Sequence, residues 1–156
     1  NLIVWKRPVD RSSSLLDIVW MSLLSAFIVT AYDLAADPYM VFVIKAWIMT
    51  RTDGWYFTET VQGFVGWVLV GFAITFTFRL LLRRIRGRPV LRFTRWHALL
   101  PVLSYAGFMG FFIVEGHPVE VRSIVVFAMG IPVLAALAGW SQWQRHEAEP
   151  DPSAAP

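Results

Sequence analysis

The sequence contains no cysteine among its 156 residues, which excludes disulfides, thiol chemistry and cysteine metal sites. It is also poor in charge: Asp, Glu, Lys and Arg make up 16% of it, where a soluble domain carries about 25%. Hydrophobic residues make up 56% and aromatic residues 15%. Because the charges are missing from long apolar runs, the composition indicates an integral membrane protein.

Four segments are long and apolar enough to cross a bilayer, which requires about 20 residues. They cover residues 15–32, 61–82, 96–114 and 119–140. Pro101 and Pro132 lie inside the last two, where membrane helices tolerate proline. The sequence therefore predicts an all-α integral membrane protein with a four-helix membrane domain over residues 15–140.

The stretch "YMVFVIKAWIM", residues 39–49, lies between the first two spans and is too short to cross a bilayer. We expect it to form a short interfacial or re-entrant helix. Pro38 disfavours helical geometry at Asp37, so the first helix is predicted to end there.

Basic residues predict the orientation. "WKRPVDR" precedes the first span, and the arginine-rich "RLLLRRIRGRPVLRFTR" joins the second span to the third. The positive-inside rule places both on the cytoplasmic side of a bacterial inner membrane, with residues 1–14 and a disordered tail, 141–156, in the cytoplasm. Lipid headgroups explain these arginines better than nucleic acid does. Since the chain begins with Asn1, we expect further residues to precede it.

The first span ends in "TAYDLAADPYM", which contains two aspartates. Asp33 and Asp37 are four residues apart and would share one helix face. At the negative end of a helix and beside apolar lipid, at least one is expected to be protonated, which suits proton donation. Glu59 supplies a third carboxyl group nearby. The alternative is that the aspartates are exposed interfacial acids that cap the next turn or pair with Lys45.

Few other motifs carry chemistry. No Gly-rich phosphate loop, nucleophile elbow or metal-spaced His/Glu pair occurs. His97, His117 and His146 lie outside the middle of the spans, where an axial ligand would be sheltered, and only His97 stays a candidate ligand for chlorophyll or haem. We expect no metal site.

Two stretches together resemble a known family. "DLAADPYM" is followed by a short Trp-containing hydrophobic stretch and then by "GWYFTETVQGFVGW". The matching positions are Asp33, Asp37, Pro38, Tyr56, Phe57, Phe64, Gly66 and Trp67. Over about residues 15–82 the chain resembles the carotenoid biosynthesis proteins that include bisanhydrobacterioruberin and γ-carotene hydratases.

The resemblance implies a reaction. Members of the family add water to the terminal double bond of an acyclic carotenoid and form a tertiary alcohol. Asp33 or Asp37 would be the acid, and the other aspartate or Glu59 would orient the water. Aromatic faces would stabilise the carbocation or bind the carotenoid, although Trp and Tyr at a membrane boundary also act as anchors. The candidate carotenoid-binding residues are Trp47, Trp55, Tyr56, Phe57, Phe64 and Trp67. The reaction needs no cofactor, and the carotenoid is the substrate or a bound pigment.

A second function stays open. The chain would then be a non-catalytic accessory membrane subunit of a photosynthetic pigment–protein complex that binds carotenoid or packs against partner helices. Its partners would be membrane lipids, carotenoid and other membrane subunits, without nucleic acid. Carotenoid retained by the purified protein would favour this function. A small transporter is disfavoured because the spans carry no opposite-charge pairs of the kind that mark ion paths.

Overall fold

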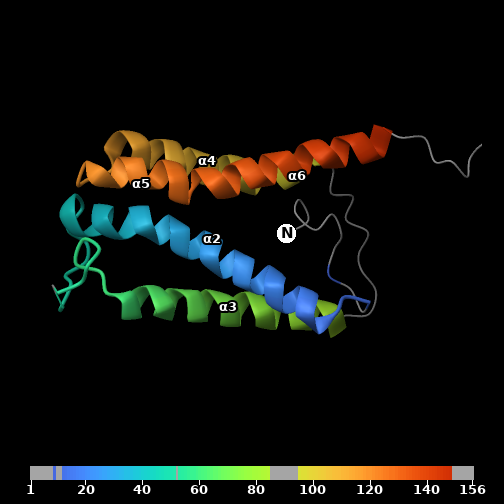
Figure 1. The fold of residues 1–156 in the computed structure, drawn as a ribbon, viewed down its shortest axis with the longest axis horizontal. Helices are drawn as coiled ribbons and strands as arrows, with labels where there is room; N and C mark the ends of the chain where they lie inside the picture. Colours follow the sequence, from blue (N-terminus) through green and yellow to red (C-terminus); the bar gives the residue numbers. More distant parts are fainter. Residues whose placement is uncertain (1–8, 10–11, 52, 85–94, 149–156) are drawn as a thin grey trace, which may run out of the picture.

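The computed structural model describes residue 9 and residues 12–51, 53–84 and 95–148, without the side chains of residues 95 and 143–148. In these residues the chain is helical and contains no sheet (Figure 1). The helices are α2 (Leu15–Phe42), α3 (Val61–Arg84), α4 (Arg95–Glu115), α5 (Glu120–Ala128) and α6 (Gly130–Ala148). Most of the predicted segment 1–14, the centre of the arginine-rich loop (85–94) and the last residues of the tail (149–156) lie outside the described part.

Four helical stretches of the described chain are long and apolar enough to cross a membrane: Leu15–Phe42, Val61–Arg84, Trp96–Glu115 and Glu120–Gln142. This confirms the predicted fold class. Their outer surfaces carry many exposed large apolar side chains, and Arg79 is the one buried residue of α3. Such a surface is stable only in contact with lipid, so the protein is a membrane protein.

Helix α2 lies between α3 on one side and the layer of α4, α5 and α6 on the other (Figure 1). On the α3 side, Gly71 sits so close to Ala26 that an added Cβ atom would lie 3.3 Å from the Ala26 Cα. The hydroxyl of Thr75 donates to the carbonyl of Ser22 at 3.3 Å. Small residues at this contact let the two helix backbones approach closely, as is usual in membrane proteins.

On its other side, α2 packs into an aromatic and aliphatic core. Buried side chains of α2, α4 and α5, together with Met129, form this core: Ala35, Ala36, Phe112, Val121, Val125 and Met129. The ring of Tyr32 meets Phe108 and Phe112 edge-on, with centroids 5.4 and 5.6 Å apart. Helix α2 is therefore the central element of the bundle.

The fourth crossing is predicted as one helix but is divided into α5 and α6 at Met129. Pro132 explains the division, because it has no N–H to donate to the carbonyl of Ala128. The amide of Met129 still donates to Val125 at 2.9 Å, and that of Val133 to Met129 at 3.2 Å, so the crossing continues. Helix α6 then extends to Ala148, beyond the predicted span end. This part of the tail is helical because Ala, Gln, Glu and Arg favour helix.

Helix α2 continues past the proline at which it is predicted to end. Its N-cap is Ser14, whose hydroxyl accepts the amide of Asp17 at 3.0 Å, and the helix includes Pro38 before it ends at Phe42. Residues 39–42 form the end of α2 and residues 44–50 are not helical, so the structure has no separate helix over the predicted range 39–49. Lys45 has a left-handed backbone (φ 57°), which breaks the helix direction.

A hydrogen bond from outside the helix explains why Pro38 does not end it. Because proline has no N–H, the carbonyl of Leu34 loses its usual partner four residues later. The hydroxyl of Tyr56, 22 residues along the chain from Leu34, donates to this carbonyl at 2.6 Å. The loop after α2 thus supplies the bond that the helix cannot make for itself.

We expect Tyr56→Phe to destabilise the protein by about 1–3 kcal/mol, because the Leu34 carbonyl is then buried without a partner. In a Pro38→Ala background the cost should be smaller, since the new amide takes over the carbonyl. Thermal unfolding in detergent of the wild type, the two single variants and the double variant measures the coupling between Tyr56 and Pro38. Tyr105→Phe is the matched control, because its hydroxyl donates to Ile28, whose carbonyl faces no proline. Equal costs of Tyr56→Phe in both backgrounds would contradict this explanation.

The close approach of α2 and α3 gives a second prediction. Gly71→Leu should destabilise the protein by about 1–3 kcal/mol, because the new side chain meets the Ala26 backbone. Gly66→Leu on the same helix should have little effect, because an added Cβ atom there meets nothing within 4 Å. The difference between the two midpoints of thermal unfolding checks the prediction, and equal midpoints would rule out this helix contact.

Candidate active site

Asp33 and Asp37 lie inside α2, near its C-terminal end, where the start of α3 and the loop between them also lie. Asp37 is 2% exposed and Asp33 is partly buried. Asp37 is therefore not an exposed interfacial acid, which was one of the two interpretations of the sequence. The continuation of α2 through Pro38 places both aspartates on the helix surface instead of in a connecting turn.

Several polar atoms here are buried without a hydrogen-bond partner among the described residues. They are both carboxylate oxygens of Asp37, Oδ2 of Asp33, the hydroxyl of Thr30 and the hydroxyl of Thr58. Burying such groups without partners is costly, and it is rare in folded proteins. Thr30, Asp33 and Asp37 are three and four residues apart, so these atoms follow one face of α2.

A strained two-residue turn holds the loop over this face. The amide of Glu59 donates to the carbonyl of Tyr56 at 2.7 Å, and Phe57 and Thr58 between them have φ values of 44° and 75°. Turns with two left-handed residues normally use Asn and Gly, and a β-branched residue is disfavoured there. Each such residue costs about 1–3 kcal/mol, so the fold stores strain where it positions Tyr56 and Glu59.

Glu59 brings the third carboxyl group to the aspartates. Its Oε1 accepts the amide of Thr60 at 3.2 Å. The carboxyl group of Glu59 is close enough to Asp33 and to Asp37 for electrostatic repulsion between the negative charges. An added Cβ atom at Gly63 would overlap Oε1 of Glu59, so the missing side chain of Gly63 leaves the space for this carboxyl group. The three predicted catalytic residues are therefore neighbours in the fold.

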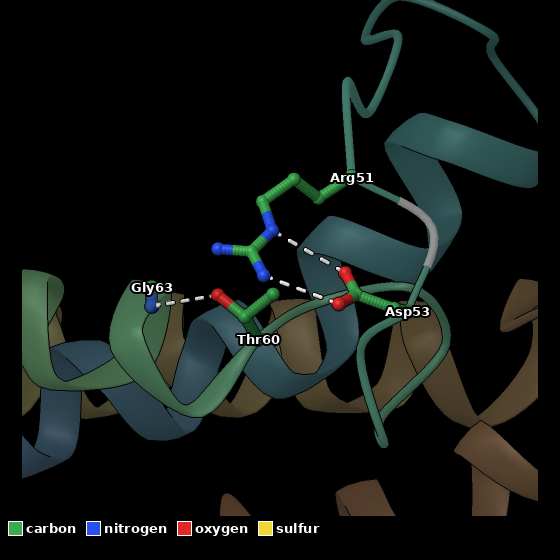
Figure 2. A network of polar contacts seen from close by, with 4 residues as sticks. All are labelled: Arg51, Asp53, Thr60 and Gly63. Atoms are coloured by element: carbon green, nitrogen blue, oxygen red, sulfur yellow. Dashed lines mark hydrogen bonds and ion pairs between the residues drawn. The ribbon is translucent and has the colours of Figure 1, made fainter.

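Hydrogen bonds at the start of α3 fix the loop (Figure 2). The amide of Gly63 donates to the hydroxyl of Thr60 at 3.1 Å, which caps the helix. The guanidinium of Arg51 donates to both carboxylate oxygens of Asp53, at 3.3 and 3.1 Å. Because both side chains of this ion pair are exposed, it contributes little to stability, and it lies outside the carboxyl group cluster.

Tyr56 connects the loop to α2 through its hydrogen bond to the Leu34 carbonyl. Burial and the nearby charge of Asp37 raise the pKa of Tyr56 to about 12. The phenol therefore stays protonated at neutral pH and keeps donating to the Leu34 carbonyl.

Four of the six predicted carotenoid-binding residues form one aromatic cluster. The Tyr56 ring meets Phe57 with centroids 4.8 Å apart and Phe64 at 5.6 Å, and Trp55 lies 6.0 Å from Tyr56. Trp47 instead lines a separate pocket with Lys45, and Trp67 is exposed on α3. Among the described residues neither of these two tryptophans has a ring contact with the cluster.

An apolar groove of about 470 Å³ runs between α2 and α3 beside this cluster. Phe27, Thr30 and Leu34 of α2 line it, with Phe64 and Leu69 of α3 and Trp55 of the loop. Thr30 and this groove are missing from the sequence prediction. The sequence could have indicated Thr30 through its spacing, because a residue three positions before Asp33 lies on the same face of a helix.

The histidines take no part in this arrangement in the described chain. His97 is exposed at the start of α4, and His117 is exposed between α4 and α5. The side chain of His146 lies outside the described residues.

Comparison with known proteins agrees with the resemblance and extends it. The family described as "carotenoid biosynthesis protein" matches residues 3–139. No curated protein and no solved structure matches the chain. The family match covers most of the sequence and includes every carboxyl group, aromatic side chain and groove residue described above. The chain therefore belongs to the carotenoid biosynthesis protein family.

Proposed function

We propose that the protein adds water to the terminal carbon–carbon double bond of an acyclic carotenoid. The family supports a role in carotenoid biosynthesis. The observation that carries the finer proposal is Asp37: a buried carboxyl group with no hydrogen-bond partner among the described residues and with two further carboxyl groups nearby. It follows Leu34, which lines the apolar groove, by three residues on the same helix. Acid groups in apolar surroundings suit proton transfer to a hydrocarbon.

The proposed steps assign one role to each group. A buried carboxyl group costs least in its neutral form, so Asp37 is the acid. Its proton goes to the less substituted carbon of the double bond, whose π electrons form the new C–H bond and leave a tertiary carbocation. Water then adds to the cation, and its proton passes to a carboxylate and returns to Asp37. The net change is the addition of one water molecule.

The remaining groups would stabilise and guide this reaction. The faces of Trp55, Tyr56 and Phe64 would attract the cation. Glu59 lies on the loop, outside the spans, and would orient the entering water together with Asp33. In this proposal the loop side of the site faces the external surface of a bacterial inner membrane, with both termini in the cytoplasm.

Asp37→Asn should lower hydration by about 10²–10⁴-fold, the usual contribution of a general acid. The assay is the amount of hydroxylated end groups in cells that make an acyclic carotenoid and express each variant. Asp33→Asn should also reduce the product. Asp53→Asn is the matched control in the neighbouring loop and should behave like wild type, because Asp53 is exposed and pairs with Arg51. Normal product from Asp37→Asn at equal protein level would exclude Asp37 as the acid.

The space beside Gly63 provides an independent test. In Gly63→Ala the new methyl group displaces the Glu59 carboxyl group while the fold is kept, because the overlap is with the end of a flexible side chain. We expect hydration to fall by about 10- to 100-fold, as for other small displacements of catalytic groups. Gly66→Ala on the same helix, where the methyl group enters open space, should leave the activity unchanged. Hydration at the wild-type level in Gly63→Ala would mean that Glu59 has no role in the reaction.

The accessory-subunit function remains the second candidate, and the apolar groove favours it too, because it would hold a carotenoid that is never converted. The same cells distinguish the two functions. A folded wild-type chain that forms no hydroxylated product but retains carotenoid through purification supports the accessory subunit.

A further inference from the structure

Lys45 occupies a backbone position that favours a different residue. It follows the end of α2 and has a left-handed conformation (φ 57°), which glycine adopts most easily. The amide of Ile44 before it donates to the Tyr39 carbonyl at 3.1 Å. The amide of Ala46 after it donates to the Met40 carbonyl at 2.9 Å. These two bonds fix the turn, so the lysine side chain leaves the backbone from a defined place.

The ammonium group of Lys45 has no hydrogen bond or ion pair among the described residues. It therefore does not pair with Asp33 or Asp37, which was one of the interpretations of the sequence. Arg51, the second cation of this loop, is instead paired with Asp53 (Figure 2). Lys45 is exposed, so an anion from outside the chain can reach it.

Lys45 lines a pocket of about 470 Å³ beyond the end of α2. This volume is within the range of small-molecule sites, about 300–1,000 Å³. The pocket shares no lining residue with the apolar groove between α2 and α3. Lys45 carries the one charged side chain of the lining, and the other lining residues are mostly apolar: Val41, Phe42, Trp47, Ile48, Met49 and Thr58.

The length of α2 places this pocket at the level of the lipid headgroups. A helix of 28 residues is about 42 Å long, whereas the hydrocarbon core of a bilayer is about 30 Å thick and the whole bilayer about 40–45 Å. Residues that follow Phe42 therefore lie beside headgroups. Ile48 is 90% exposed and Trp47 is 44% exposed on the protein itself, and such side chains are stable at this level when lipid covers them.

We infer that this pocket binds an anionic phospholipid of the leaflet in which the loop lies. Lys45 pairs with the headgroup phosphate, and the apolar lining covers the upper part of the acyl chains. The charge of Lys45 and the apolar lining together favour a lipid over a soluble anion. Thr58 lines the pocket and also belongs to the strained turn before Glu59, so the bound lipid lies against that turn. The inference does not depend on the proposed hydration.

The test follows thermal unfolding of the purified protein in non-ionic detergent during titration with phosphatidylglycerol, which is anionic, or phosphatidylcholine, which is neutral overall. The rise of the unfolding midpoint with lipid concentration gives an apparent affinity for each lipid. One lysine at an anionic surface corresponds to about a fivefold gain in affinity. The preference for phosphatidylglycerol should therefore fall about fivefold in Lys45→Met, which keeps the length of the side chain, and should stay in Lys45→Arg. An unchanged preference in Lys45→Met would overturn the assignment.

Two further variants separate this site from general charge and from a structural role. Arg51→Gln removes the paired cation of the same loop and should change the preference less than twofold, because exposed charges outside the pocket are screened. An equal loss in Arg51→Gln and Lys45→Met would overturn the pocket as the site. Lys45→Gly should lose the preference but unfold in neutral lipid at the wild-type temperature or higher, because glycine suits the left-handed turn. A lower midpoint would assign Lys45 to the fold and not to lipid.

The apolar part of the pocket and the source of the phosphate are tested in the same way. Ile48→Ser should weaken the binding of both lipids about three- to tenfold, which corresponds to covering about half of an isoleucine side chain. Ile44→Ser, also exposed but outside the lining, should weaken it less. Glycerol phosphate and inorganic phosphate at equal ionic strength should leave the midpoint unchanged. A rise with either one that is absent in Lys45→Met would identify a site for a free phosphate and overturn the lipid.

Discussion

The hydrogen bond from Tyr56 to the Leu34 carbonyl links the helix that carries the acids to the loop that covers them. Proline removes the internal partner of that carbonyl, and in lipid no water replaces it. Because the loop tyrosine donates instead, α2 continues for another turn, and Asp33 and Asp37 remain on one helical face. The same bond holds the loop in place, so it also fixes the position of Glu59. The fold thus uses one compensating bond to build two parts of the site.

The two ends of the α2–α3 pair use buried polar groups in opposite ways. At one end the Arg79 guanidinium, 5% exposed, donates to the hydroxyls of Ser22 and Ser25 at 3.1 and 2.8 Å and to a backbone carbonyl. The two serine bonds join α3 to α2, and together the three bonds give partners to three of the five guanidinium donors. At the other end the carboxyl oxygens of Asp37 and the hydroxyl of Thr30 have no partner among the described residues. Only the second arrangement leaves buried polar atoms without a partner among the described residues.

Hydropathy alone predicted the four crossings, and spacing alone predicted that Asp33 and Asp37 share a face. Both properties depend on residues close together in the chain. The extension of α2 could not be predicted this way, because the rule for Pro38 is local and the compensating hydroxyl comes from Tyr56, 22 residues beyond the carbonyl that it binds. The helix expected at 39–49 failed for a related reason: apolar length resembles a helix, but the left-handed backbone at Lys45 turns the chain away. Thr30 has no feature in the sequence that distinguishes it from other residues of a span, because its lack of a hydrogen-bond partner among the described residues is a property of the fold.

The free-energy cost of burying Asp37 and of straining the turn at Phe57 and Thr58 favours a catalytic role over a purely structural one. A subunit that only packs or binds pigment gains nothing from a buried carboxyl group without a cation partner, since an apolar residue of similar size is usually as stable or more stable. It also gains nothing from left-handed Phe57 and Thr58, which store strain in the turn above that group. Hydration of an alkene, in contrast, requires an acid in apolar surroundings and a second carboxyl group fixed where water enters. The unfavourable features of the fold are gathered where this chemistry needs them, which supports the enzymatic proposal over the accessory one.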